Sequence, residues 1–211
     1  SVLAWFFYST SRAQDATGEP ALTRRMEVLS APGIVVFALS LNFAAFDLLM
    51  SLDPHWFSTI YGVYYFASSV LLFFAVMPKL LVWFQAQGLL KHAVTVEHYH
   101  DIGKFMFAFT VFWAYIAFSQ YMLIWYGNIP EETQWFLKRQ TGDWTGISLA
   151  LLFGHFVLPF LLLISRHVKR RPLPLAVIGV FVAVMCWVDM YWLVIPEFSP
   201  GVARFGALDI L

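Results

Sequence analysis

Charged residues are scarce in this chain. Asp, Glu, Lys and Arg make up 12% of its 211 residues, whereas hydrophobic residues make up 60% and aromatic residues 19%. A soluble globular domain usually carries about a quarter charged residues, so the deficit indicates that lipid is the solvent for much of the chain. The formal net charge is zero, which argues against a nucleic-acid partner.

Cysteine is nearly absent as well. The single thiol, Cys186, cannot build a disulfide framework, a structural zinc site or an iron–sulfur cluster within this chain. The GxSxG, Walker A and HExxH motifs are also missing, so hydrolase, ATPase and metalloprotease functions have no support. We therefore expect this chain to bind no metal or redox cofactor of its own.

Histidines are too few inside the apolar segments for a haem held by this chain alone. A haem between membrane helices normally takes two axial histidines, and His155 is the one histidine at membrane depth. His55 is expected at the membrane surface. The others fall in or next to loops, at His92, His98, His100 and His167.

Long apolar windows are abundant instead. A hydrocarbon core of about 30 Å needs roughly 20 apolar residues in a helix. Five windows meet that length: Ala31–Ser51, Ser58–Phe84, Phe105–Tyr126, Trp144–Ile164 and Leu173–Ile195. They are continuously apolar and do not alternate, which excludes a β-barrel. The sequence predicts an all-α polytopic membrane protein, a transmembrane helix bundle with five complete spans.

Both ends of the chain carry shorter apolar stretches. Val2–Tyr8 is followed by the polar run Ser9–Arg12, and we expect residues 1–8 to be part of a further span. Phe205–Leu211 is expected to open another apolar segment. The whole chain is interpreted as one transmembrane bundle.

The loops differ in positive charge, and this predicts the orientation in the membrane. Lys and Arg accumulate on the cytoplasmic side of bacterial membrane proteins. One side of this chain holds Arg12, Arg24, Arg25, Lys91, Lys104, Arg166, Lys169, Arg170 and Arg171, and the other holds Lys138, Arg139 and Arg204. The Arg166–Arg171 loop is therefore predicted to be cytoplasmic, with Asp53–Phe57 and Asn128–Asp143 outside.

Ionisable residues inside the spans are candidates for function. Asp47, His155 and Asp189 are costly in hydrocarbon and should face the bundle interior or a wet cavity. Together with Tyr61 and Gln120, they concentrate between mid-membrane and the outer surface. Carboxylates can accept a quinol proton and a histidine can bind a quinone carbonyl, so this group predicts a quinone pocket or a proton path. Interhelical hydrogen bonding is the alternative.

His155 has a further feature, because Pro159 follows it by four residues and has no N–H for the His155 carbonyl. A kink with a free carbonyl is expected there. In the cytoplasmic run Glu97–Asp101, histidines and acids would share a helical face. A solvated surface or a proton-collecting cluster is the favoured interpretation of this run over a metal site.

Several uncommon strings resemble the ActF-type integral membrane subunits of bacterial alternative complex III. The resemblance covers nearly the whole chain and is carried by Ser51–Tyr65, Asp101–Lys104, Phe107–Tyr121, Ile124–Thr133 and Asp189–Pro196. The related ActC subunits, of the polysulfide-reductase membrane type, share this architecture.

The resemblance implies a role inside a respiratory complex of the bacterial inner membrane. Such complexes oxidise membrane quinol and pass electrons toward cytochrome c or copper acceptors. The partners it implies are an ActC-like membrane subunit, an iron–sulfur subunit and a multi-haem cytochrome c subunit. ActF-type subunits carry no metal and are associated with quinone or menaquinol. A non-catalytic scaffold of the complex and a secondary transporter remain as alternative functions.

Overall fold

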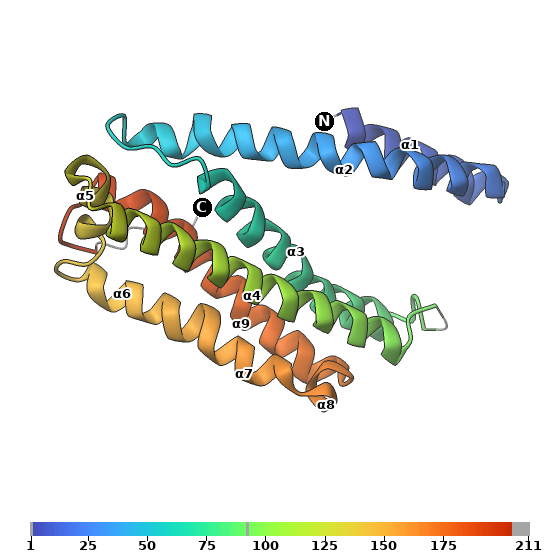
Figure 1. The fold of residues 1–211 in the computed structure, drawn as a ribbon. Coiled ribbons are helices and arrows are strands. Elements are labelled where there is room, and N and C mark those ends of the chain that lie inside the picture. The colour runs from blue at the N-terminus through green and yellow to red at the C-terminus, as the bar shows by residue number, and fades with distance from the viewer. Residues whose placement is uncertain (1, 92, 204–211) are drawn as a thin grey trace.

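The computed structural model describes residues 2–91 and 93–203, and the described chain is helical without strands (Figure 1). His92, Arg204 and the predicted apolar segment Phe205–Leu211 lie outside the described residues. Five helical stretches are long and apolar enough to cross a membrane, which confirms the predicted fold class. They are Pro20–Leu52, Tyr61–Ala86, Val96–Gly127, Trp144–Ile164 and Pro172–Glu197.

These stretches are built from regular helices joined by short ones. The long helices are α1 (Val2–Thr17), α2 (Pro20–Leu48), α3 (Tyr61–Ala86), α4 (Val96–Gly127) and α9 (Pro172–Val194). The fourth span is continuous but composite, with α6 (Trp144–Ala150), η2 (Leu151–Val157) and α7 (Leu158–Ile164). The short elements are η1 (Met50–Leu52), α5 (Pro130–Lys138), α8 (Arg166–Lys169) and η3 (Ile195–Glu197).

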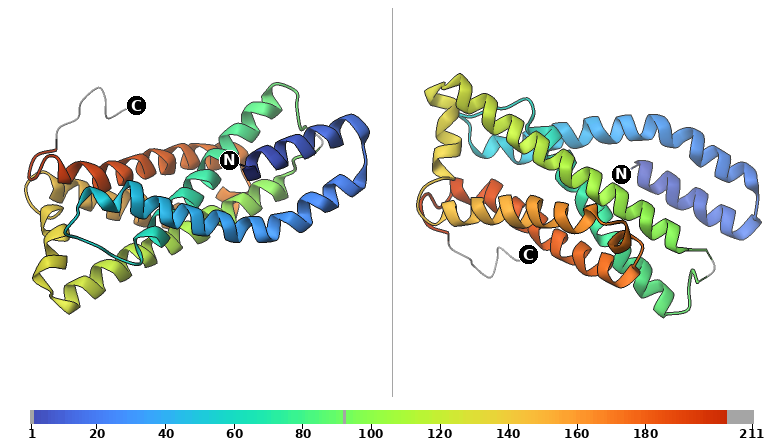
Figure 2. Two further views of the ribbon diagram at one scale, coloured as in Figure 1. Left: turned by 90° about the horizontal axis from the view of Figure 1, so that it is seen from above. Right: turned by 60° about the horizontal axis from the view of Figure 1, so that its bottom comes forward.

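The first two helices form a hairpin that stands out from the rest of the bundle (Figure 1, Figure 2). The apolar stretch Val2–Tyr8 and the polar run Ser9–Arg12 belong to one helix, because α1 continues to Thr17 and stops only at Gly18, whose φ of +67° favours glycine. The Ser9 hydroxyl donates to the Phe6 carbonyl at 3.1 Å, so this polar residue stays within the helix. α1 is shorter than the five spanning stretches.

The remaining spans pack into one bundle around α3, α4 and α9. Small residues allow the closest approaches between them. A Cβ added at Gly179 of α9 would lie 2.2 Å from the Ala75 carbonyl oxygen of α3. A Cβ at Gly62 would overlap the side chain of Asn42, which is how α2 rests on the start of α3.

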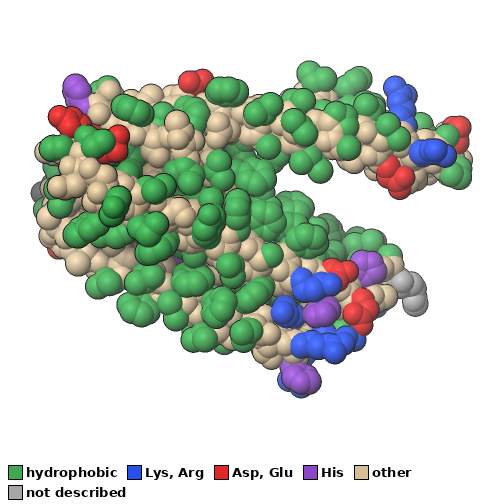
Figure 3. Space-filling model, in the orientation of Figure 1, with side chains coloured by type: hydrophobic (Ala, Val, Ile, Leu, Met, Phe, Trp, Pro, Cys, Tyr) green, Lys and Arg blue, Asp and Glu red, His purple; other side chains and the backbone are tan. Residues whose placement is uncertain are grey.

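Charged side chains gather at the two ends of the molecule, with hydrophobic side chains along its length between them (Figure 3). One end holds η1, α5 and η3, and we call it the α5 end (Figure 1). The other holds the α1–α2 turn, the loop between α3 and α4, and α8. This arrangement is that of a multi-pass membrane protein, whose apolar belt faces lipid and whose ends face water.

Candidate functional site

Asp189 is the most enclosed acid in the described part of the chain. It has no exposed surface and lies on α9, facing α3 and α4. It accepts hydrogen bonds from the Tyr64 hydroxyl, from the Ser68 hydroxyl at 3.1 Å and from the Trp113 indole N–H at 3.1 Å. Three donors from two neighbouring helices therefore hold this carboxylate inside the bundle, as burial of a charged group requires.

His155 lies against the same group. Its ring is fully buried, with its centroid 4.0 Å from that of Trp113. Its Nε2 is 3.5 Å from the Cys186 thiol, and its Nδ1 has no hydrogen-bond partner in the described part of the chain. We call the six residues Tyr64, Ser68, Trp113, His155, Cys186 and Asp189 the buried polar cluster.

The helix around His155 is a π-helix, η2, running from Leu151 to Val157. The N–H of Leu158 bonds to the Phe153 carbonyl, five residues back. In an α-helix the His155 carbonyl would face Pro159, which has no N–H, whereas the wider π register reaches Phe160. The predicted irregularity at Pro159 is thus present, but as a π-helix within a continuous span. π-helices of this kind are frequent at functional sites.

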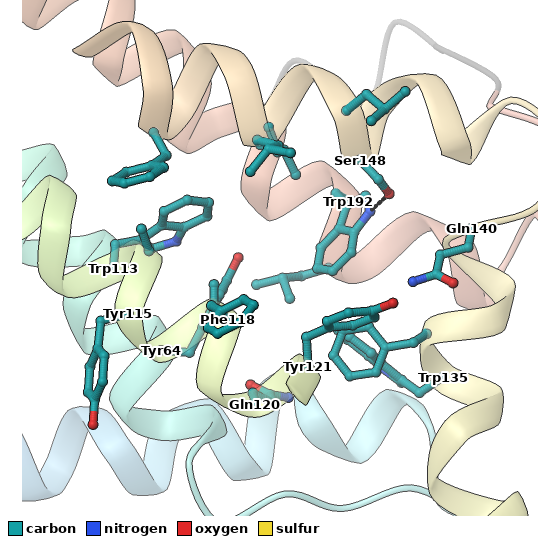
Figure 4. Close-up of a pocket in the computed structure, with 18 of the residues that line it drawn as sticks. Tyr64, Trp113, Tyr115, Phe118, Gln120, Tyr121, Trp135, Gln140, Ser148 and Trp192 are labelled. Carbon is teal, nitrogen blue, oxygen red and sulfur yellow. Dashed lines mark hydrogen bonds between the residues drawn. The ribbon is translucent and has the colours of Figure 1, made fainter. Parts of the chain in front are cut away.

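A cavity of about 830 Å³ opens between α4, α5, α6, η2 and α9 (Figure 4). Tyr64 and Trp113, which both bond to Asp189, line one side of it, and Trp135, Gln140, Ser148 and Trp192 line the other. The remaining walls are mostly apolar or aromatic: Val111, Ala114, Tyr115, Ala117, Phe118, Gln120, Tyr121, Phe136, Thr145, Leu149, Leu151, Leu152, Phe156 and Leu193. We call it the large cavity. An apolar cavity of this size with a few polar groups suits an amphiphilic organic ligand.

The predicted site residues fall in different places. Gln120 is buried and lines the large cavity, and His155 and Asp189 lie behind its Tyr64–Trp113 side. Tyr61 is buried but packs against Trp56, with ring centroids 5.7 Å apart. Asp47 is exposed on α2, so the prediction that it shares an outer-half cavity with Asp189 is wrong. Asp47 lies one residue before the end of α2, where a carboxylate can reach the membrane surface.

A second polar centre lies at the α5 end around Arg139, and it was not predicted from the sequence. Arg139 is fully buried, and its guanidinium lies 3.5 Å from the ring centroid of Trp135. It donates to the carbonyls of Trp192 at 3.1 Å, Trp135 at 2.9 Å and Leu193 at 2.8 Å. The same group pairs with Glu197 at 3.1 Å. Arg139 thereby joins the end of α5 to the end of α9.

Serine and tryptophan side chains extend this centre to the large cavity. The Ser148 hydroxyl donates to the Arg139 carbonyl at 2.7 Å and accepts from the Trp192 indole N–H at 2.8 Å. Trp135 and Trp192 both face the Arg139 guanidinium and both line the cavity. One side of the large cavity is therefore fixed by a buried arginine. The spacing of Trp135 and Arg139, four apart on a helix, was the available signal.

Lys138 adds a second cation beside Arg139. It bridges Glu197 at 2.7 Å and Asp53 at 3.1 Å. Burial opposes its charge, but the two hydrogen-bonded carboxylates raise the pKa of Lys138 above its ordinary value. Burial lowers the pKa of Arg139 to about 10, against the opposing effect of Glu197. Both cations predicted to lie outside are thus neutralised locally, and they tie α5 to η3 and to the loop after η1.

The run Glu97–Asp101 forms the first turns of α4, and its charged groups are used in ion pairs and capping. Lys104 pairs with Asp101 at 2.6 Å, Glu97 pairs with Arg170, and the His98 ring accepts from the Thr95 N–H at 3.1 Å. No group of three or more metal-ligating side chains occurs in the residues that the structure describes. These contacts are those of a solvated surface that joins α4 to the α8 region.

Comparison of the chain with protein-family models and with curated proteins finds no match to either.

Proposed function

We propose that this chain is a membrane subunit of a quinol oxidoreductase complex of the alternative complex III type, in a bacterial inner membrane, and that the large cavity binds the quinone ring. The observation that carries the proposal is that the same two side chains, Tyr64 and Trp113, line the cavity and bond to the buried Asp189. A ring in the cavity would then contact side chains that are hydrogen-bonded to the carboxylate.

Quinol oxidation releases electrons together with protons, and the geometry supports a role in the proton step. A quinol hydroxyl next to Tyr64 can donate its proton to the Tyr64 oxygen while the Tyr64 proton moves to Asp189, to which it is already hydrogen-bonded. The electrons would pass to partner subunits. Aromatic walls at Tyr115, Phe118 and Phe156 suit a planar ring, and their neighbours on α4 and α6 face lipid, where a quinone tail belongs.

The test is Asp189→Asn in the assembled complex, with Asp47→Asn as a matched control. Both changes keep side-chain shape and remove one carboxylate from a predicted span, but Asp47 is exposed on α2. We expect quinol oxidation to fall by about 10²-fold or more in Asp189→Asn, the usual range for a lost acid–base group, and to stay near normal in Asp47→Asn. Assembly is checked by native gel electrophoresis.

The result that would overturn the proposal is an assembled Asp189→Asn complex with normal quinol oxidation. A photoreactive quinone that fails to label the Tyr115–Phe118 region would also count against a ring in the large cavity. Either outcome would favour a non-catalytic scaffold, in which Asp189 serves only to bond helices together.

A further inference from the structure

A second cavity, of about 570 Å³, lies beside the large one at the α5 end. We call it the small cavity. It lies between the last two turns of α4 and the short helix α5. Its walls are Tyr121, Ile124, Trp125, Tyr126, Asn128, Thr133, Phe136, Leu137 and Gln140. Tyr126 is 88% exposed and Asn128 is exposed as well, so this cavity has an open mouth at the surface.

Three residues line both cavities: Tyr121, Phe136 and Gln140. Tyr121 comes from α4, Phe136 from α5, and Gln140 follows α5. The rings of Tyr121 and Phe136 meet edge to face, with centroids 5.2 Å apart. Figure 4 shows Tyr121 and Gln140 at the side of the large cavity where Trp135 and Trp192 also lie. We call these three side chains the partition.

The two sides of the partition differ in chemistry. Beyond the partition, the small cavity adds Asn128 and Thr133, and Glu131 and Glu132 lie between these two in the chain, in the first turn of α5. The large cavity extends from there toward mid-membrane, ending at Tyr64 and Trp113. The small cavity is therefore placed to hold water from the α5 side of the membrane, and the large one to hold an apolar ligand.

We propose that Tyr121, Phe136 and Gln140 form a gate between the ligand site and the aqueous phase at the α5 end, closed in this structure. The identity of the ligand rests on the proposed function, whereas the gate itself rests on the shared walls. For a quinol, this gate would control the access of water from the α5 end to the ligand site. α5 is held at its C-terminal end by Arg139 and Lys138, so opening needs movement of the partition side chains or of the α4–α5 turn at Asn128.

The gate can be tested without any quinone, by cysteine accessibility. Ala117 lines the large cavity and not the small one, so Ala117→Cys reports on the ligand site. The reagent is a membrane-impermeant, positively charged methanethiosulfonate, applied to sealed vesicles of either orientation. The parent chain, whose Cys186 is buried, supplies the blank.

We expect Ala117→Cys to react slowly from both sides in the otherwise unchanged protein, because thiol reactivity follows access. Adding Phe136→Ala should speed the reaction by at least about tenfold, from the α5 side alone. The matched control is Leu137→Ala, the next residue along α5, which lines only the small cavity and should leave the rate unchanged. Gln140→Ala should act like Phe136→Ala, and because Gln140 is exposed, the change removes little buried surface.

Equal rates in Phe136→Ala and Leu137→Ala would overturn the gate, as would fast labelling of the parent reporter or labelling from the α8 side. These rates need no bound ligand. A working gate in a complex with unimpaired Asp189→Asn activity would refute the proposed function and keep the gate. Loss of quinol oxidation in Asp189→Asn, together with no effect of Phe136→Ala on labelling, would refute the gate and keep the proposed function.

Discussion

Replacement of Gly179 by alanine should weaken the bundle at its closest helix crossing. A Cβ at this position would lie 2.2 Å from the Ala75 carbonyl oxygen and 3.2 Å from its carbon. Both are backbone atoms of α3, so no side chain can rotate away to make room. The contact must lengthen by roughly 1 Å to reach van der Waals distance, and α3 and α9 must move apart to allow it.

The size of the effect follows from two opposing contributions. Alanine is favoured over glycine within a helix by about 1 kcal/mol. Overpacking of a well-filled interior costs about 1–3 kcal/mol, and a clash with backbone belongs at the upper end. Gly146→Ala in α6 separates the two contributions. A Cβ at Gly146 meets no atom within 4 Å, so this variant has the helix-propensity gain without the overpacking cost. We expect Gly179→Ala to be less stable than Gly146→Ala by about 3 kcal/mol, because the propensity gain is common to both variants.

Thermal unfolding in mild detergent can measure this difference with a thiol-reactive fluorophore. Cys186 is the single cysteine and is 2% exposed, so it reacts only when the bundle opens. The unfolding midpoint should rise or stay constant in Gly146→Ala and fall in Gly179→Ala. Equal midpoints in the two variants would refute the close packing of α3 on α9.

Two further predictions concern the α5 end and the orientation. Arg139→Gln should destabilise the protein by about 3–5 kcal/mol because it removes one of the two cations that pair with Glu197 and leaves three buried backbone carbonyls without their donor. Lys138→Gln, at a partly exposed site, should cost about 1 kcal/mol or less, and equal midpoints for the two would contradict the burial of Arg139. For the orientation, a cysteine that replaces Ser165 should be labelled from the cytoplasm and one that replaces Ser58 from outside. Labelling at position 165 from outside would contradict the predicted orientation.

Helix positions could be predicted from the sequence better than helix ends. The window Trp144–Ile164 coincides with the fourth span, and the third window ends within one residue of α4. α4 nevertheless begins at Val96, nine residues before its window, because Glu97–Lys104 is helical outside the apolar belt. Apolar composition locates the part of a helix that lies in lipid, whereas capping and turn residues set where the helix stops.

The candidate site was predictable in part, for a similar reason. The cost of polar groups in lipid identified Gln120, His155 and Asp189 as residues of the interior, and all three are buried. The same cost did not apply to Asp47, near a helix end. The partners Tyr64, Ser68 and Trp113 could not be assigned, because these helices are apolar on most sides and no period fixes the side that faces the bundle.

The buried polar cluster and the polar centre around Arg139 hold two sides of the large cavity in a bundle that is otherwise held by apolar contacts. Apolar contacts are not directional, and lipid chains can replace helix neighbours at little cost. Hydrogen bonds inside the membrane have no such substitute. Tyr64 and Trp113 are fixed by Asp189, and Trp192 is fixed by Ser148 and faces Arg139. Loss of either centre should therefore disturb the cavity before it disturbs the helices, whereas loss of Phe136 should open the partition and leave both centres in place.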